Sequence, residues 1–306
     1  MSCLNIIVVN WNAGETLHTC LQSVFNSTLD KSRYHVFVVD NNSIDNSIDL
    51  ISGLSTNLTI IVNKVNIGFG GACNMVLEDY PSEFVLLLNP DVIINRDTLS
   101  DCLAFIEQNP DIDVLGVKNF NLEGKVATSC ARFPSTCRLV NDILGLSKIA
   151  PKLFKPGTIM TDWDHLDSRD VDHVIGAYMM ARYSILKEVE FFDKDYFLYL
   201  EDLDLTKKIK KAGGRIYYNS EISIIHEGGG TTKRIRAISL YYSLQSRIIY
   251  SRKHFKPLST ALFILLSTTF EPLIRIIKMC ITFDFRDFYN ICRAYGKYYK
   301  WLIFGK

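Results

Sequence analysis

Short apolar runs alternate with stretches of helical periodicity over the first 120 residues. Five apolar runs are predicted strands, at residues 4–9, 35–40, 58–62, 84–88 and 114–117. Helical patterns lie between them near residues 15–26, 71–79 and 97–108. Strands that are almost continuously apolar and separated by helices are typical of a parallel sheet covered on both faces. The pattern therefore predicts an α/β fold.

Polar loops follow four of these strands. They lie at residues 10–12 (Asn-Trp-Asn), 40–43 (Asp-Asn-Asn-Ser), 66–71 (Asn-Ile-Gly-Phe-Gly-Gly) and 89–91 (Asn-Pro-Asp). Each loop alone has the composition of an ordinary turn, because Asn, Asp and Gly favour turn conformations. Parallel strands end at one edge of their sheet, where ligands of such folds bind. Four polar loops in succession at that edge favour a binding cleft.

The second half of the chain begins after a weakly periodic region at about residues 121–170. Its predicted elements are strands at 171–180, 215–219 and 221–225, a short helix at 182–189, and a basic helix at 206–211. From about residue 234 the chain is expected to be mainly helical. Charge divides at the same point: residues 1–232 hold 20 Lys and Arg against 30 Asp and Glu, whereas residues 233–306 hold 14 against 3. We therefore expect an acidic α/β domain at 1–232 and a basic, aromatic helical region at 233–306.

The glycine-rich loop at residues 68–71 precedes a predicted helix, as in dinucleotide-binding folds. That fingerprint requires a third glycine at position 73, where the chain has Cys73, and it follows the first strand rather than the third. The pattern therefore argues against a dinucleotide site. The glycines still allow close approach of a ligand, and a helix N-terminus favours an anion.

Three further places carry candidate chemistry. Asp91 is either a helix cap or a carboxylate that shares a Mg²⁺ ion with a diphosphate. Glu201 and Asp202 begin a helix, where acidic residues also complement the helix dipole. The apolar residues 197–200 before them would raise a carboxyl pKa by desolvation, which suits a general base. His226 ends a predicted strand before three glycines and is either structural or part of a second site.

Together, these motifs resemble the inverting family 2 glycosyltransferases of GT-A fold, and among them the rhamnosyltransferases of bacterial surface polysaccharides such as O-antigen. The matching segments occur in the family's order over about residues 4–254. They are residues 8–12, 38–43, 66–74, 88–91, 176–182, 192–193, 199–205 and 226–230. The resemblance implies a GT-A domain, with a mostly parallel sheet and helices on both faces, that takes a sugar from a nucleoside-diphosphate donor.

The resemblance also implies roles for individual residues. The nucleotide-sugar pocket would consist of Asn10, Trp11, Asn12, Asp40, Asn42, Asn66, Gly68, Asn74, Asn89 and Asp91. Within it Asp40 would hydrogen-bond the pyrimidine base, residues 10–12 would line the nucleoside, and Asn66, Gly68 and Asn74 would shape the ribose and diphosphate pocket. Asp91 with His226 would hold Mg²⁺ or Mn²⁺. The catalytic residues would be Asp202, the base facing the same crevice as Asp91, and Glu201, which would contact the acceptor or orient the site. The acceptor or sugar pocket would be formed by Gly176, Ala177 and Glu201.

The chain departs from the family pattern at Asn89, which stands where the family has the first Asp of its Asp-x-Asp metal motif. A carboxamide binds a nucleotide or a water but is a poorer ligand for a divalent cation, so metal dependence is less firmly implied than nucleotide binding. In the implied reaction, Asp202 takes a proton from an acceptor hydroxyl, which attacks the anomeric carbon opposite the leaving diphosphate and inverts it. A cation at Asp91 would stabilise the leaving group.

The basic C-terminal region is expected to contact a membrane surface. Its apolar run 257–270 is 14 residues long and is followed by Glu271-Pro272, whereas a spanning helix needs roughly 20 residues. The last 23 residues contain eight aromatics interspersed with Lys and Arg, a composition typical of amphipathic helices at a bilayer interface. A solvated extension packed on the main domain is the alternative. No nucleic-acid-binding motif accompanies the basic residues.

The eight cysteines form no CxxC pair and have no zinc-like spacing, and the N-terminus has no secretory pattern; we expect free thiols in the cytoplasm. The sequence thus predicts an enzyme, peripheral on the inner face of the cell membrane, that moves L-rhamnose from dTDP-rhamnose to a polyprenyl-diphosphate-linked glycan. UDP-galactose or UDP-N-acetylglucosamine is the alternative donor. A non-catalytic sugar-nucleotide-binding subunit is the alternative from another class. A nucleotidyltransferase is disfavoured because residues 10–14 contain no basic residue.

Overall fold

The computed structural model describes residues 3–146, 150, 153–154, 158–228, 236–283 and 285–305. Ten strands form the main sheet: β1 (Leu4–Asn10), β2 (Tyr34–Asp40), β3 (Leu58–Val62), β4 (Phe84–Leu88), β5 (Val92–Ile94), β6 (Val114–Phe120), β7 (Val126–Ala127), β9 (Arg169–Asp170), β11 (Tyr178–Arg182) and β12 (Ile216–His226). The order along the sheet is β3-β2-β1-β4-β11-β6-β12-β5, with β7 beside β6 and β9 beside β12. Strands β1 to β4 are parallel, whereas β11 is antiparallel to both β4 and β6.

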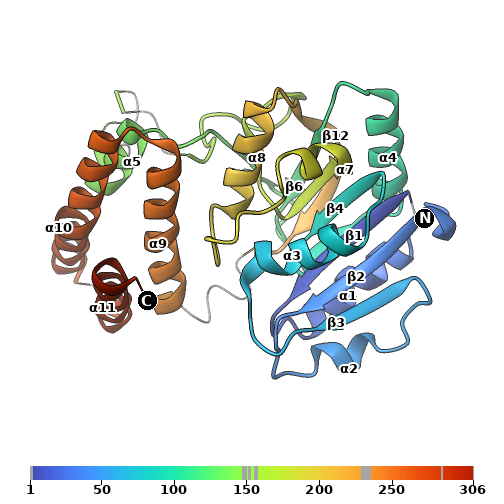
Figure 1. Cartoon of the computed structure of the whole chain (residues 1–306), viewed down its shortest axis with the longest axis horizontal. Helices are drawn as coiled ribbons and strands as arrows, with labels where there is room; N and C mark the ends of the chain where they lie inside the picture. Colours follow the sequence, from blue (N-terminus) through green and yellow to red (C-terminus); the bar gives the residue numbers. More distant parts are fainter. Residues whose placement is uncertain are drawn as a thin grey trace.

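Helices cover both faces of this sheet (Figure 1). They are α1 (Glu15–Phe25), α2 (Ser47–Ile51), α3 (Gly68–Asp79), α4 (Thr98–Gln108), α7 (Tyr183–Glu188) and α8 (Glu201–Lys211). Alternate residues of β1 point to opposite faces, as the pleat of a strand requires: Ile6 and Val8 pack with α1 and α4, whereas Ile7 packs with α3, α7 and α8. The predicted α/β fold with a mostly parallel, doubly covered sheet is confirmed.

Two predictions for the second half of the chain are wrong. The strand predicted at 171–180 is two strands, because β10 (His173–Val174) pairs instead with β8 (Cys130–Ala131) in a separate small sheet. The strands predicted at 215–219 and 221–225 are one continuous strand, β12, whose register shifts between Asn219 and Ser223. The Asn219 carboxamide oxygen accepts the N–H of Glu221 at 2.8 Å and of Ile222 at 3.3 Å, and so satisfies backbone donors at the irregularity.

Four helices gather at one end of the molecule, beside the sheet domain (Figure 1). They are α5 (Thr136–Leu144), α9 (Arg236–His254), α10 (Pro257–Thr282) and α11 (Phe288–Phe304). Their shared core includes Ile143, Ile248 and Phe263. Helix α5 comes from the region expected to be weakly structured, so this bundle draws on more of the chain than the predicted 233–306. The predicted boundary between residues 232 and 233 lies outside the described residues, as do Gly229 and Gly230.

The apolar C-terminal run does not end at Pro272, contrary to the sequence-based expectation. Helix α10 continues through this proline to Thr282 and is 26 residues long. Proline has no N–H and leaves the carbonyl four residues earlier without its helical partner. That carbonyl, on Thr268, accepts the hydroxyl of Tyr299 from α11 at 2.6 Å. Beside it, Glu271 is buried between the guanidinium groups of Arg247 and Arg275, which anchors the same turn.

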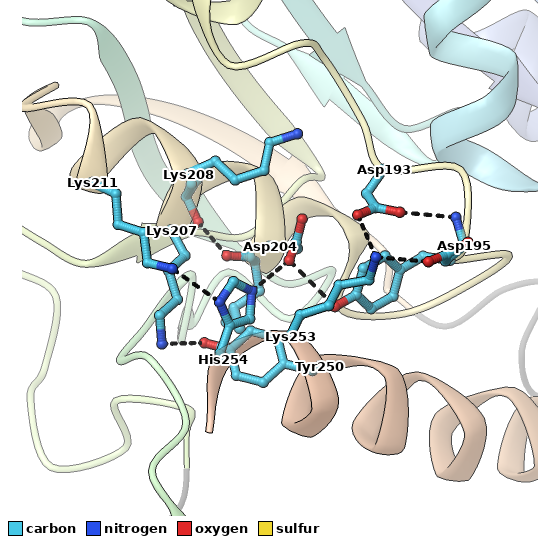
Figure 2. Close-up of polar contacts among 12 residues, drawn as sticks. Asp193, Asp195, Asp204, Lys207, Lys208, Lys211, Tyr250, Lys253 and His254 are labelled. Carbon is cyan, nitrogen blue, oxygen red and sulfur yellow. Dashed lines mark hydrogen bonds and ion pairs between the residues drawn. The ribbon is translucent and has the colours of Figure 1, made fainter. Parts of the chain in front are cut away.

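A polar cluster joins the bundle to α8 of the sheet domain, as Figure 2 shows. His254 on α9 lies between Asp204 and Lys211, with its Nε2 2.6 Å from the Asp204 carboxylate and its Nδ1 3.3 Å from the Lys211 ammonium. The Lys207 ammonium donates to the Tyr250 hydroxyl at 3.0 Å. Lys253 bridges the carboxylates of Asp193 and Asp195, which precede α8. The His254–Asp204 pair is almost completely buried, whereas Lys253 is partly exposed.

We expect His254→Ala to lower the free energy of unfolding by about 3 kcal/mol, because it leaves the buried Asp204 carboxylate without its partner. Lys253→Ala is the matched control on the same helix, and its exposed ion pairs should contribute about 1 kcal/mol or less. Urea unfolding followed by circular dichroism measures both. Equal losses for the two variants would show that the buried pair has no special part in docking α9.

Candidate active site

The carboxyl ends of the central strands bring several predicted residues to one edge. Asn10 ends β1 and lies in register with Asp40, the last residue of β2. Asp91 follows β4 and directly precedes Val92, the first residue of β5, which pairs in register with His226 at the end of β12. The sheet therefore places these polar residues along its carboxyl edge although they come from distant parts of the chain.

Asp91 and His226 form a pair. The imidazole Nε2 lies 3.3 Å from the carboxylate Oδ1, and the side chains are 18% and 16% exposed. The N–H of Glu227 donates to the Asp91 carbonyl at 3.2 Å, which ties the two segments together. A carboxylate suits Mg²⁺ or Mn²⁺, and a neutral imidazole is a common metal ligand. Within the described residues, no group of three or more His, Cys, Asp or Glu could hold a metal. The pair therefore fits a cation whose remaining ligands come from phosphates.

Asp202 stands in the first turn of α8 and is anchored by two backbone donors. Its Oδ1 accepts its own helix's N–H from Leu203 at 2.8 Å, and its Oδ2 accepts the N–H of Gly176 at 3.0 Å. The imidazole Nε2 of His173 lies 3.5 Å from the same Oδ2. A Cβ on Gly176 would sit 3.0 Å from this oxygen and 3.3 Å from the Asp202 Cβ. Glycine at 176 therefore allows the carboxylate to reach the backbone there, and 22% of the Asp202 side chain stays exposed.

A short path of backbone contacts connects Asp202 to Asp91. Gly176, which holds the Asp202 carboxylate, is followed by Ala177, whose carbonyl accepts the N–H of Asn89 at 2.9 Å. Asn89 lies two residues before Asp91. The two carboxylates are thus attached to adjoining strand ends, β4 and β11. That both line a single crevice remains a prediction.

The two neighbouring carboxyls at the start of α8 differ in protonation. Burial, and next the charge of Asp202, raise the pKa of Glu201 to about 8. Burial also acts to raise the pKa of Asp202, but His173 and the N–H groups of Gly176 and Leu203 outweigh it, so this pKa is lowered. The raised pKa expected for the base therefore falls on Glu201 and not on Asp202. Glu201 is buried, and within the described residues its Oε2 has no hydrogen-bond partner. At neutral pH Asp202 is the ionised member of the pair.

The turn before α8 holds its first residues against α3. Tyr199 and Leu200 have φ values of 70° and 65°, the left-handed region that costs non-glycine residues about 1–2 kcal/mol each. Just before them, the Phe197 carbonyl accepts the N–H of Phe69 at 3.3 Å. Gly68 has φ +80°, and a Cβ there would lie 2.2 Å from that carbonyl oxygen. Gly68 is thus required by this contact between two loops, whatever it does for a ligand.

The predicted nucleoside residues form a hydrogen-bonded corner at the ends of β1 and β2. The Asp40 Oδ1 accepts both the Asn10 amide at 2.6 Å and the Ser43 hydroxyl at 2.6 Å, and its Oδ2 accepts the N–H of Ser43 at 3.0 Å. The Asn12 carboxamide oxygen accepts the N–H of Ile44 at 2.8 Å. These bonds fix the loop shape, and contact of Asp40 with a base remains a prediction. Trp11 is partly exposed and Asn42 is exposed beside this corner.

The predicted ribose and diphosphate residues also have contacts within the protein. The Asn66 carboxamide oxygen accepts the N–H of Gly68 at 2.9 Å. Asn74 is buried, and its amide donates to the Phe192 carbonyl at 2.8 Å while its oxygen accepts the Phe192 N–H at 3.0 Å. Both polar atoms of Asn74 are therefore engaged with the loop that leads to α8. Its predicted ligand contact remains untested, and holding that loop is the role its contacts support.

The sequence analysis missed His173 and Thr206. His173 is buried on β10, and its Nδ1 lies 3.0 Å from the Thr206 hydroxyl, while its Nε2 faces Asp202. A histidine within an apolar strand carries no local signal of function, and Thr206 looked like an ordinary helix residue. Only the packing of β10 against α8 brings them to the carboxylate.

The raised pKa of Glu201 predicts how stability varies with pH. An unfolded Glu titrates near 4.5, whereas this one titrates at about 8, so between these values the folded chain keeps a proton that the unfolded chain loses. Stability therefore falls as pH rises across this window. We expect Glu201→Gln to flatten the decline in Tm between about pH 5 and pH 8. Each kcal/mol of unfolding free energy that the variant regains at the upper end should raise its Tm by about 2–4 °C. Differential scanning calorimetry tests this against Glu188→Gln, an exposed control. Parallel curves for both variants and the wild type would contradict it.

Comparisons with known proteins agree with this geometry. Residues 5–189 match the family described as Glycosyl transferase family 2. The N-acetylglucosaminyl-diphospho-decaprenol L-rhamnosyltransferase of Mycobacterium tuberculosis is 25% identical over 81% of this chain and 83% of its own length. Rhamnosyltransferase WbbL of Escherichia coli is 27% identical over 67% of this chain and 77% of its own length.

A similar fold occurs in the mannosyltransferase PcManGT of Pyrobaculum calidifontis, solved with GDP-Man and Mn²⁺. It aligns with a TM-score of 0.57 at 14% identity, over 99% of this chain and 76% of that one. At that identity the likeness concerns the fold, which is of the GT-A type. Because the family match spans more than half of the chain, the resemblance seen in the motifs is confirmed: this protein is a member of the family 2 glycosyltransferases.

Proposed function

We propose that this glycosyltransferase moves a sugar from a nucleoside-diphosphate donor to a hydroxyl of a lipid-linked glycan, with inversion, and that Asp202 is the base. The observation that carries the proposal is the state of Asp202: it is ionised, reaches solvent, and is held by backbone donors one strand away from the Asp91–His226 pair. The buried, protonated Glu201 beside it is unsuited to accept a proton at neutral pH.

In the proposed reaction, Asp202 accepts the proton of an acceptor hydroxyl while that oxygen forms a bond to the anomeric carbon. The bond from this carbon to the diphosphate oxygen breaks on the opposite face, so the configuration inverts. A carboxylate with a lowered pKa suffices, because the hydroxyl becomes strongly acidic as its new bond forms. Asp91 and His226 would hold a divalent cation, Mn²⁺ or Mg²⁺, which supplies positive charge to the departing diphosphate.

We propose that the donor is dTDP-rhamnose and that the transferred sugar is L-rhamnose. Two relatives that match most of this chain are rhamnosyltransferases by name, and this supports the choice. A UDP-hexose such as UDP-galactose or UDP-N-acetylglucosamine is the second candidate, because the same site chemistry would serve it. Direct binding to dTDP-rhamnose and to these UDP-sugars, with and without Mn²⁺, distinguishes the two.

We expect Asp202→Asn to lower transfer from dTDP-rhamnose by at least about 10³-fold while the Kd for the donor changes less than about threefold. The amide keeps the shape but cannot accept the proton, and removal of an essential base costs factors of this order or more. Calorimetry measures donor binding and chromatography measures product. Lys210→Gln serves as a control on the same helix. Turnover of Asp202→Asn near the wild-type rate would remove Asp202 from the mechanism.

We further propose that α10 lies at a membrane surface, where a lipid-linked acceptor resides. The face of α10 turned to the protein carries polar residues, among them the buried Ser267 and Glu271. The face turned outward carries exposed apolar side chains: Leu258, Leu262, Leu265, Leu273, Ile277 and Ile281. The outward face of this helix is largely apolar, and exposed apolar patches of this kind mark interaction sites.

Basic residues accompany this apolar face. Lys256 and Lys278 on or beside α10, and Lys297 and Lys300 on α11, are exposed, and each basic group near an anionic bilayer adds about 1 kcal/mol. In the described part of the chain, α10 is the helix long and apolar enough to cross a membrane by length and composition. Its inward contacts to α9 and α11 through Arg247 and Tyr299 favour lying along the surface.

We expect the double variant Leu262→Asn and Ile277→Asn to reduce flotation with phosphatidylglycerol-containing vesicles by at least about tenfold, because it removes apolar area that inserts into the interface. Leu122→Asn is the matched control: Leu122 is 65% exposed but lies in the sheet domain. Unchanged flotation of the double variant would exclude this face as the attachment surface. Retained Tm would show that the loss is not due to unfolding.

A further inference from the structure

His173 is a buried imidazole with one nitrogen on each of two polar partners. It lies on β10 and is 3% exposed. Its Nε2 is 3.5 Å from the Asp202 Oδ2, and its Nδ1 is 3.0 Å from the Thr206 hydroxyl, one helical turn further along α8. At 3.5 Å the contact with Asp202 is long for a hydrogen bond, so its effect on the carboxylate is mainly electrostatic.

The contacts of Thr206 limit which nitrogen of His173 carries a proton. The Thr206 hydroxyl lies 3.1 Å from the backbone carbonyls of both Asp202 and Leu203. If the hydroxyl donates to either carbonyl, it accepts from Nδ1–H of His173; if it donates to Nδ1, the proton of a neutral ring resides on Nε2. In the first case a neutral ring would turn a lone pair on Nε2 toward the ionised carboxylate, which is repulsive. The second arrangement avoids this and directs an Nε2–H at Asp202.

The groups around His173 leave Asp202 as its charged partner. The elements packed against β10 are β8, α8 and β12. Burial raises the pKa of Cys130 on β8 to about 12 and that of Tyr218 on β12 well above its usual value, so both are neutral. Glu201 on α8, with a pKa raised to about 8 by burial and then by Asp202, is protonated at neutral pH. Asp172, the preceding residue, points to the opposite side of the strand and accepts the N–H of Phe133.

We propose that His173, oriented by Thr206, is a positioning residue for the sugar-transfer reaction: it holds the Asp202 carboxylate toward Gly176 and directs its remaining lone pairs to the acceptor. The inference rests on the proposed function of Asp202 as the base. Without His173, the donors left to Asp202 are the N–H groups of Gly176 and Leu203, against the burial that favours the protonated acid. An acid at this position cannot accept the hydroxyl proton.

The direct test is the titration of Asp202 itself, followed by ¹³C NMR of the carboxyl carbons in the full chain, with Asp202→Asn identifying its signal. We expect His173→Phe, which keeps a ring but no donor, to raise the midpoint by about one pH unit or more. His173→Gln, whose amide can still reach Oδ2, should give a smaller increase. His165→Phe is the matched control, because His165 is equally buried but contacts Trp163 rather than α8. An unchanged midpoint in His173→Phe, with Tm retained, overturns the proposal.

The pH dependence of transfer from dTDP-rhamnose supplies the second readout. We expect the acidic limb of kcat to move to higher pH in His173→Phe by the same shift as the Asp202 midpoint, with KM for the donor within about threefold. A loss of kcat that is the same at every pH, and that His165→Phe reproduces, would mean a structural role and contradict the inference. If Asp202→Asn itself retains turnover, the proposed base fails. If Asp202→Asn is inactive but the His173 variants behave as wild type, this inference alone fails.

Discussion

The hydrogen bond from the Gly176 N–H to the Asp202 carboxylate is the contact on which the site depends. It joins the start of α8 to the segment between β10 and β11, 26 residues earlier in the chain. A side chain at 176 would push the carboxylate away, so glycine is needed for the contact itself. Because Ala177 then bonds to Asn89 of the neighbouring strand end, the position of Asp202 relative to Asp91 is set by backbone geometry. Backbone donors hold a carboxylate in place at little entropic cost, since they are ordered by the sheet already.

Helix α8 is also fixed from its other side. Asp204 and Lys207 contact His254 and Tyr250 of α9 (Figure 2), so the helix that carries the proposed base also carries the docking contacts to the bundle. Helix α10 shares the bundle core with α5, α9 and α11, and its other, apolar face points outward. If α10 rests on a bilayer as proposed, the distance of Asp202 from the lipid surface is fixed by rigid packing. That arrangement suits an acceptor whose sugar is tethered to a lipid.

The fold was predictable where local rules suffice. Strand β4 is apolar throughout and β1 and β2 are nearly so, and a run that is buried on both faces needs no tertiary information to be recognised. The full length of helix α10 was not predictable, because a proline after a glutamate normally indicates the end of a helix. What permits Pro272 is a hydroxyl from Tyr299, 27 residues later, that satisfies the Thr268 carbonyl. Strand β10 was misplaced for a similar reason: its partner, β8, lies in a region without periodicity.

The sequence indicated the residue types of the site but not their division of work. Glu201 and Asp202 are adjacent and follow the same apolar segment, so desolvation alone would raise both pKa values. Successive residues of a helix, however, point about 100° apart. Glu201 lies toward Cys73 on α3: burial raises the pKa of that thiol, and the charge of Glu201 raises it further. Asp202 instead meets His173 and Gly176. The ionised carboxylate is therefore selected by donors that packing supplies, whereas the amide side chains of Asn10 and Asn74 hold neighbouring segments of the edge in shape.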